Sequence, residues 1–254
     1  MAFIPGLVSV SFRKLSPREV VELARVCGLK AMEWGGDVHV PRGDFPRARE
    51  VRAMTADAGL NVTAYGSYLR LGEADAATFP MVIETVNELG APAIRVWAGK
   101  RGSAEADEGY RQRVIDQARE LATLAADVGV TVCYEYHVDT LTDSDASALA
   151  LLRATADQPA LKTLWQPPHE RSVEENVASL RGVLPWLHHV HVFHWPKRGE
   201  RAPLADGAAR WRAYLDVLRE DHRHDWPLLL EFVRGDDPAQ LHADAATLHE
   251  WIGQ

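Results

Sequence analysis

The sequence is poor in cysteine, in long apolar runs and in positive charge, and each shortage excludes a class of protein. Its 254 residues include only two cysteines, Cys27 and Cys133, which lack the spacing of a zinc knuckle. They are too few for a disulfide framework, so we expect two buried free thiols in a reducing cytoplasm. A chain of this length can bury a core that folds without a disulfide or structural metal.

Long apolar runs are absent as well. No stretch approaches the roughly 20 apolar residues needed to cross a bilayer, and the first apolar run is broken by Pro5 and Gly6, unlike a targeting signal. The formal net charge is −8, without the basic stripe that nucleic-acid binding requires. We therefore expect a cytoplasmic protein that binds neither nucleic acid nor membrane. The sequence leaves open whether the protein forms a homo-oligomer.

What the sequence does contain is a regular alternation of two patterns. Short β-branched or aromatic runs alternate with longer segments whose apolar residues recur at helical spacing. The expected strands are Leu7–Phe12, Leu29–Trp34, Asn61–Tyr65, Ala93–Trp97, Val130–Tyr136, Leu161–Gln166, His189–Phe193 and Leu228–Val233. The expected helices are Ser16–Gly28, Pro46–Ala58, Ala77–Leu89, Tyr110–Val128, Asp143–Ala156, Val173–Leu180, Ala208–Arg219 and Pro238–Trp251.

Eight such units predict an α/β fold, a single (β/α)8 TIM barrel over residues 1–254. Strict alternation of strand and helix forces parallel pairing through crossover helices. Ser16 and Glu19 have the spacing of a capping box, and a glycine that can end a helix precedes several strands. An open doubly wound sheet is the alternative. It would normally carry a glycine-rich phosphate loop after the first strand, where this chain has Arg13-Lys14-Leu15.

Polar residues at the strand ends indicate where a site would lie. Active sites of these barrels form at the carboxyl ends of the strands, and side-chain alternation directs four polar residues inward there: Glu135, Gln166, His191 and Glu231. An inward carboxylate is costly unless it is paired, hydrogen-bonded or metal-bound. The set is an oxygen-rich site for one divalent metal ion, with Mn²⁺ or Mg²⁺ favoured and Co²⁺ or Zn²⁺ as other choices.

Plainer interpretations exist for each residue taken alone. A strand-end glutamate is as often a salt-bridge partner, and a lone histidine is more often a hydrogen-bonded core residue; the coincidence on four successive strands favours the metal. The first half of the chain adds Glu33, His39, Arg95 and Trp97, and His137 follows the fifth strand. We expect these to bind substrate, although Glu33 and Arg95 could equally form a buried ion pair.

The order of these motifs resembles a known superfamily. Glu135, Gln166-Pro167-Pro168-His169, Val190-His191-Val192 and Leu230-Glu231-Phe232 are similar to the xylose isomerase-like sugar phosphate isomerases and epimerases, the ketose 3-epimerases in particular. The resemblance covers nearly the whole chain through short motifs. It implies that Glu135, Gln166, His191 and Glu231 bind the metal and that Glu135 and Glu231 act as the catalytic acid–base pair. It also implies substrate contacts by His169 and Lys197.

Two positions depart from that superfamily. Gln166 stands in place of an aspartate, which removes one negative charge from the metal ligands, so weaker metal binding is expected. His194 stands where many members carry an acidic residue. Lys197, Arg198 and Arg201 could hold a substrate phosphate or carboxylate, or form a solvated basic loop.

The resemblance implies metal-assisted proton transfer next to the carbonyl of a small-molecule sugar or sugar phosphate. An isomerase or epimerase is the first expectation. Loss of a hydroxyl group instead would make the protein a dehydratase acting on a cyclic or keto-sugar substrate. A catalytically inactive barrel that binds a partner is the third alternative, and Gln166 is the main argument for it. The acidic charge balance disfavours the DNA-repair endonucleases of the superfamily.

Overall fold

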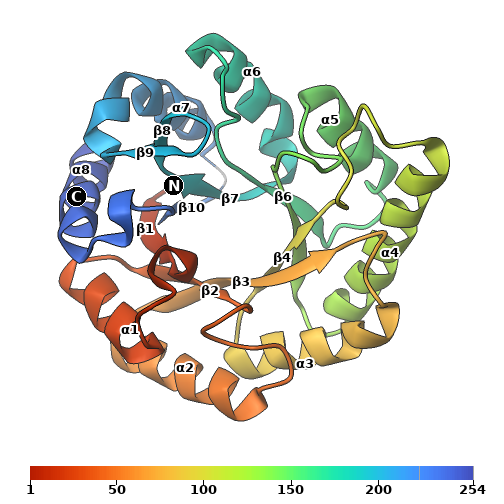
Figure 1. Ribbon diagram of the computed structural model, residues 1–254, viewed down its shortest axis with the longest axis horizontal. Helices are drawn as coiled ribbons and strands as arrows, with labels where there is room; N and C mark the ends of the chain where they lie inside the picture. Colours follow the sequence, from red (N-terminus) through yellow and green to blue (C-terminus); the bar gives the residue numbers. More distant parts are fainter. Residues whose placement is uncertain (223, 254) are drawn as a thin grey trace.

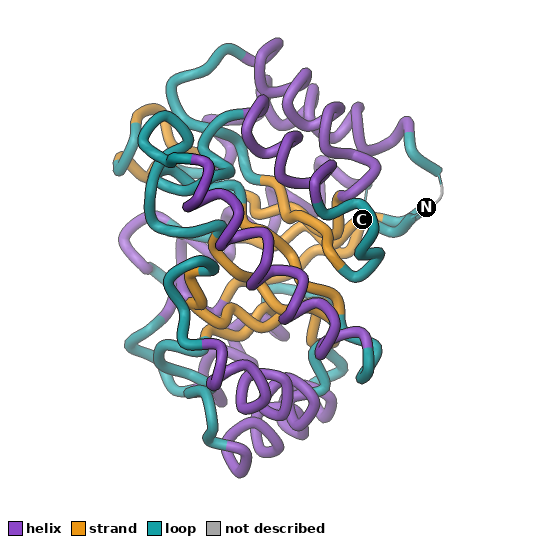
Figure 2. Tube along the Cα trace, turned by 90° about the vertical axis from the view of Figure 1, so that its right-hand side faces the viewer, coloured by secondary structure: helices purple, strands orange, loops and turns teal. Residues whose placement is uncertain are grey.

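Eight parallel strands close into a barrel that is surrounded by helices (Figure 1). The computed structural model describes residues 1–222 and 224–253. Around the barrel the strands follow the order β1-β10-β7-β6-β5-β4-β3-β2, and a side view shows the helices outside them (Figure 2). The predicted (β/α)8 TIM barrel is confirmed.

The elements have the following bounds. The barrel strands are β1 Phe3–Val8, β2 Ala31–Gly35, β3 Asn61–Arg70, β4 Ala93–Trp97, β5 Thr131–Glu135, β6 Leu161–Trp165, β7 Leu187–Val192 and β10 Trp226–Leu230. The helices are α1 Pro17–Val26, α2 Phe45–Asp57, α3 Phe79–Leu89, α4 Glu108–Ala126, α5 Asp145–Ala154, α6 Val173–Val183, α7 Ala208–Glu220 and α8 Pro238–Ile252. A separate antiparallel hairpin consists of β8 His194–Lys197 and β9 Glu200–Ala202.

The first strand lies earlier in the chain than expected. β1 spans Phe3–Val8, and the next four residues, Ser9–Phe12, form a 3-10 turn. Pro5 and Gly6 suggested a break, yet both lie inside the strand and pair with β10. The glycine is required by packing, because a Cβ at Gly6 would lie 2.5 Å from the carbonyl oxygen of Ala31.

The predicted capping signals are present. The Ser16 side chain accepts a hydrogen bond from the backbone N–H of Glu19, and the Glu19 carboxylate accepts one from the N–H of Ser16. Gly90 ends α3 in the left-handed region at φ 71°, where a Cβ would add strain. Among the described residues, none of the helices is both long enough and apolar enough to span a membrane.

Two apolar clusters separate from the large core lie along the strands, and several of their side chains are small. One cluster is formed by Val8, Val10, Ala31 and Leu229, and another by Ala64, Ala93 and Cys133. The large core cluster instead includes residues of both the strands and the surrounding helices.

Candidate active site

A buried polar cluster occupies the carboxyl-terminal half of the barrel. It consists of Glu33 on β2, Arg95 on β4, Glu135 at the end of β5, His191 on β7 and Glu231 directly after β10. All five side chains belong to residues that are at most 4% exposed. Charged groups so deeply buried must compensate one another or bind an ion.

Arg95 joins two of the carboxylates. Its Nε donates to Glu33 Oε1 at 2.6 Å and its Nη1 to Glu135 Oε2 at 2.5 Å. Gly66 on β3 makes space for this guanidinium, because a Cβ there would lie 2.3 Å from Arg95 Nη2. Burial alone would raise the pKa of Glu33, but Arg95 and His191 hold that pKa well below its usual value. The buried ion pair that the sequence left open is therefore present.

His191 lies between two further carboxylate oxygens. Its Nε2 is 2.9 Å from Glu33 Oε2, and its Nδ1 is 3.2 Å from Glu231 Oε2. Burial alone would lower the pKa of His191, but Glu231 and Glu33 raise that pKa to about 10. In the absence of a metal ion, the imidazole is therefore protonated at neutral pH.

The donor atoms fit a divalent cation. Ligand atoms of Glu135, His191 and Glu231 all lie within 4.8 Å of one another. Three buried ligand atoms make no directed hydrogen bond among the described residues: His191 Nδ1, Glu231 Oε2 and Gln166 Oε1. For His191 Nδ1 and Glu231 Oε2 this holds despite their proximity. Glu33 holds the other nitrogen of His191, as the outer-shell carboxylate of a metal-bound histidine does.

Gln166 is anchored so that its amide oxygen stays available. Its Nε2 donates to the carbonyl oxygen of Tyr136 at 2.6 Å and lies 3.3 Å from Glu135 Oε1. The charges also match a neutral residue here: three carboxylates face one guanidinium, and a divalent ion would neutralise the two charges that remain once His191 gives up its proton to become a ligand. A fourth carboxylate at this position would leave a buried negative charge without compensation.

A pocket of about 360 Å³ opens beside this cluster. Gln166 and His137 line it, and an aromatic wall is formed by Phe193, Trp195, Phe232 and the imidazole of His169. The His169 and Trp195 rings are stacked, with centroids 4.9 Å apart and planes 11° from parallel. Arg198 supplies a cation to the lining. The pocket thus combines flat apolar surfaces with charged side chains of both signs, positive at Arg171 and Arg198 and negative at Asp143 and Glu170.

Two non-glycine residues of the pocket lining have a left-handed backbone conformation. Phe232, which follows Glu231 directly, has φ 52°, and the pocket residue Glu170 has φ 60°. Non-glycine residues in this region carry an energetic cost that surrounding contacts must offset, and such residues cluster at functional sites.

The structure brings most of the expected site residues together, but not all. Trp97 packs against His137 with ring centroids 5.4 Å apart. His39 lies elsewhere: it is 2% exposed, and its Nε2 is 3.0 Å from the carbonyl oxygen of Leu15. Lys197 is exposed on the β8–β9 hairpin and does not line the pocket, whereas its neighbour Arg198 does.

Two groups of residues were missed by sequence reasoning. Phe193 and Phe232 of the aromatic wall were placed in strands without a role, whereas His169 in the same wall was expected to contact substrate. The short β8–β9 hairpin was not expected either, and Gly199 in its turn was the available signal. His189 was placed in a strand without a role, yet its Nε2 is 3.3 Å from Glu33 Oε2.

Comparison with known proteins places the chain in a family. Residues 21–252 match the family model described as the xylose isomerase-like TIM barrel. The chain belongs to this family. A curated relative, a 3-dehydroshikimate dehydratase of Bacillus anthracis, is 28% identical over 203 residues, which cover 73% of this chain and 70% of the relative.

Solved structures show the same fold. A probable dehydratase of the same name from Bacillus anthracis superposes with a TM-score of 0.81 at 23% identity, over 98% of both chains. The protein IolI, which binds a zinc atom, gives a TM-score of 0.78 at 14% identity over 99% of this chain and 98% of its own. A D-allulose 3-epimerase from Methylomonas sp. in complex with D-allulose gives 0.77 at 13% identity, over 99% and 97%.

Proposed function

We propose that this protein is a metal-dependent dehydratase that acts on a cyclic β-hydroxy ketone bearing a carboxylate. The observation that carries the proposal is the set of buried ligand atoms on Gln166, His191 and Glu231 that make no directed hydrogen bond among the described residues, beside a pocket with aromatic walls. The curated dehydratase relative supports a dehydratase, which is a lyase, over the isomerase that the order of the motifs suggested. We infer 3-dehydroshikimate, the compound in that relative's name, as the first substrate to test.

Glu135, Gln166, His191 and Glu231 would hold the metal ion. When bound, a divalent cation supplies positive charge for the carbonyl oxygen on which negative charge develops during proton removal. We favour Mn²⁺ or Mg²⁺ because most of the donors are oxygens, while the imidazole also allows Zn²⁺ or Co²⁺.

Glu231 is the better placed base of the two glutamates. Its Oε2 makes no directed hydrogen bond and pairs with the His191 imidazole at 3.2 Å, whereas Glu135 accepts from both Arg95 and Gln166. Held in place by these two donors, Glu135 would bind and orient the metal ion rather than transfer protons. Glu231 removes the proton α to the carbonyl, the bond to the β-hydroxyl breaks, and the same proton leaves with that hydroxyl as water. The carboxylate is thereby regenerated.

The pocket suits a flat ring with an acidic substituent. Trp195 and Phe232 offer faces for an unsaturated ring, and such aromatic contacts contribute about 0.5–1.5 kcal/mol beyond burial. Arg198 can bind a carboxylate through its planar guanidinium. Since loss of water from the ring of 3-dehydroshikimate followed by enolisation yields a dihydroxybenzoate, substrate and product both match this lining.

The direct test is an ultraviolet assay with 3-dehydroshikimate and Mn²⁺. We expect absorbance of an aromatic dihydroxybenzoate to appear with wild-type protein and to disappear with a chelator. Glu231→Gln should lose at least about a thousandfold in rate, the upper range of a proton-transfer contribution, with an unchanged circular dichroism spectrum. Full activity of Glu231→Gln would exclude it as the base.

A sugar isomerase or epimerase is the second candidate. It is supported by the fold of the D-allulose 3-epimerase and by the presence of two glutamates in one cluster, which could exchange protons from two sides of a carbon. Deuterium incorporation from D₂O into a panel of ketoses and ketose phosphates distinguishes the two candidates. Incorporation without dehydration of any cyclic keto acid would establish the isomerase and overturn the dehydratase.

A further inference from the structure

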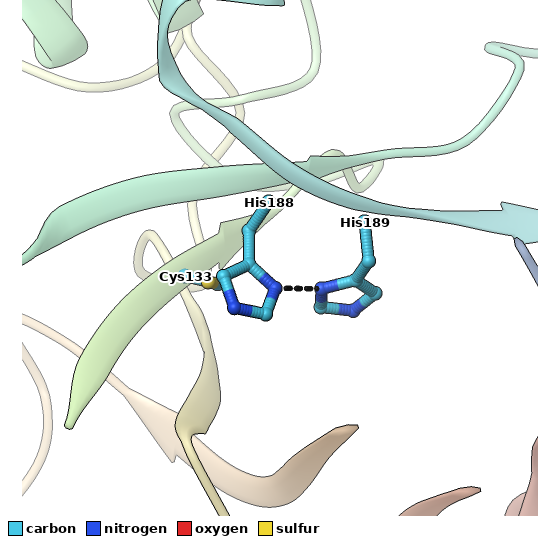
Figure 3. Close-up of side chains that lie close together, drawn as sticks. All are labelled: Cys133, His188 and His189. Atoms are coloured by element: carbon cyan, nitrogen blue, oxygen red, sulfur yellow. Dashed lines mark hydrogen bonds between the residues drawn. The ribbon is translucent and has the colours of Figure 1, made fainter. Parts of the chain in front are cut away.

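A second cluster of metal-ligating side chains lies deeper in the barrel. Cys133 on β5 and the adjacent residues His188 and His189 on β7 come together there (Figure 3). One ligand atom from each lies within 4.8 Å of the other two. Thiolate and imidazole groups of this kind select zinc, cobalt or copper(I) rather than magnesium or calcium.

An irregularity of β7 makes the cluster possible. Successive side chains of a regular strand point to opposite faces, so two adjacent histidines would normally diverge. Here Thr163 of β6 pairs with Leu187, while the next residue, Leu164, pairs with His189. His188 is thus an extra residue, and a bulge of this kind re-aims side chains. Both rings then meet, with their Nδ1 atoms 2.8 Å apart.

Hydrogen bonding leaves a lone pair of His189 available for this cluster. Arg95 keeps Glu33 ionised, so Glu33 can only accept, and the Nε2 of His189 at 3.3 Å must carry the donated hydrogen. In a neutral imidazole the other nitrogen, Nδ1, is then unprotonated. A carboxylate that fixes the tautomer in this way is the usual outer partner of a metal-bound histidine.

We propose that Cys133, His188 and His189 form a second metal site, for a zinc-like ion, distinct from the carboxylate cluster of the candidate active site. On binding, the Cys133 thiol loses its proton to solvent and forms a metal–sulfur bond. His188 moves its hydrogen from Nδ1 to Nε2, and both Nδ1 atoms become ligands. The two rings must separate by roughly half an ångström, since tetrahedral ligand nitrogens at about 2.0–2.1 Å from zinc lie farther apart than the present hydrogen bond. A fourth position remains for water.

The surroundings are compatible with such an ion. Cys133 and His189 are fully buried, whereas His188 is partly exposed and gives the cluster a route to solvent. The neighbours of Cys133 inside the barrel are the small residues Ala64 and Ala93. Lys162 on β6 is in register with Cys133; burial raises the pKa of the Cys133 thiol, and the Lys162 charge opposes that shift.

Cobalt titration of the full-length, metal-free, reduced protein tests the proposal. Sulfur ligation to Co²⁺ produces a near-ultraviolet charge-transfer band, which the carboxylate cluster cannot give because it contains no sulfur. We expect the band in wild-type protein, with two Co²⁺ bound per chain. Cys133→Ser should lose the band and one Co²⁺, and Glu231→Gln should keep the band.

Two further variants make the result decisive. Cys27→Ser is the matched control, since the Cys27 Sγ lies 3.4 Å from His242 Nδ1 and is the other thiol that could ligate; it should retain the band. His188→Gln, at a partly exposed position, should weaken Co²⁺ binding by more than the roughly tenfold cost of losing an outer-shell partner. Absence of the band in wild-type protein at excess Co²⁺, or its loss in Cys27→Ser rather than Cys133→Ser, would overturn the proposal.

Discussion

At the scale of single residues, Arg95 is the group on which the buried carboxylates depend. Its guanidinium contacts Glu33 and Glu135 directly. The side-chain alternation of β4 predicts that Arg95 points inward, but the sequence could not distinguish a substrate ligand from an ion-pair partner. That outcome depends on Gly66 of β3, whose missing Cβ makes space for the guanidinium and which lies in another βα unit.

Replacement of Arg95 by methionine should destabilise the fold strongly. Breaking a buried ion pair by removing one partner typically costs about 3–5 kcal/mol, because the carboxylates stay buried without compensation. Urea unfolding followed by circular dichroism measures the loss, and Arg47→Met, which removes an exposed pair with Glu50, is the control. A change below about 1 kcal/mol would show that Arg95 does not hold these carboxylates.

Gln166 gives a second prediction at this scale. In Gln166→Glu, a carboxylate oxygen would replace Nε2 and face the Tyr136 carbonyl oxygen and Glu135. Without metal, the unfolding free energy should fall by about 1–3 kcal/mol, the cost of unsatisfied buried polar groups. Saturating Mn²⁺ should recover more stability in the variant than in the wild type, because the added charge binds the cation.

Thermal unfolding with and without Mn²⁺ measures both effects. Gln158→Glu, in a surface turn after α5, serves as the control. Equal stability of Gln166→Glu and wild type without metal would contradict the account of the Gln166 anchor.

At the scale of elements, regular strands were predictable and irregular ones were not. β4 was predicted with its observed ends, Ala93–Trp97, and Glu135, Gln166, His191 and Glu231 were placed inward by alternation alone. β3 continues to Arg70, with a register shift between Gly66 and Arg70, and β7 contains a bulge. Register shifts depend on the neighbouring strand, so no pattern within one strand reveals them.

The β8–β9 hairpin should contribute to substrate binding. It supplies Trp195, which stacks on His169 in the pocket wall. Trp195→Ala should raise KM by about 2- to 10-fold, the equivalent of an aromatic contact of about 0.5–1.5 kcal/mol, with a smaller change in kcat. Glu200→Ala, exposed on the same hairpin, should leave both constants unchanged. A fall in kcat with KM unaffected would instead assign Trp195 to the chemical step.

At the scale of the whole molecule, the metal ion should act as part of the fold. A ligand that binds only the native state stabilises it by RT ln(1 + [L]/Kd), about 2.7 kcal/mol at a hundredfold excess over Kd. For a chain of 254 residues this corresponds to a rise in Tm of roughly 5–10 °C. Calorimetry of chelator-treated protein with increasing Mn²⁺ measures it. A Tm independent of Mn²⁺ would exclude a site in the carboxylate cluster.

The overall architecture could be predicted from the sequence because the same strand–helix unit repeats along the chain. Eight strand–helix units, each with its own capping and turn signals, specify a barrel through local information. The reaction is less readable from the sequence, since isomerases and dehydratases can use the same pair of carboxylates on the same fold.

Glu33 Oε2 contacts two histidines of one strand, at 2.9 Å from His191 and 3.3 Å from His189. A single oxygen shared in this way links the two histidines thermodynamically. Any proton or cation gained by one histidine changes how strongly Glu33 can hold the other, and by reciprocity the effect has the same size in both directions. Cation binding at the proposed Cys133–His188–His189 site should therefore change the cation affinity of the proposed carboxylate site through Glu33, without any movement of the backbone.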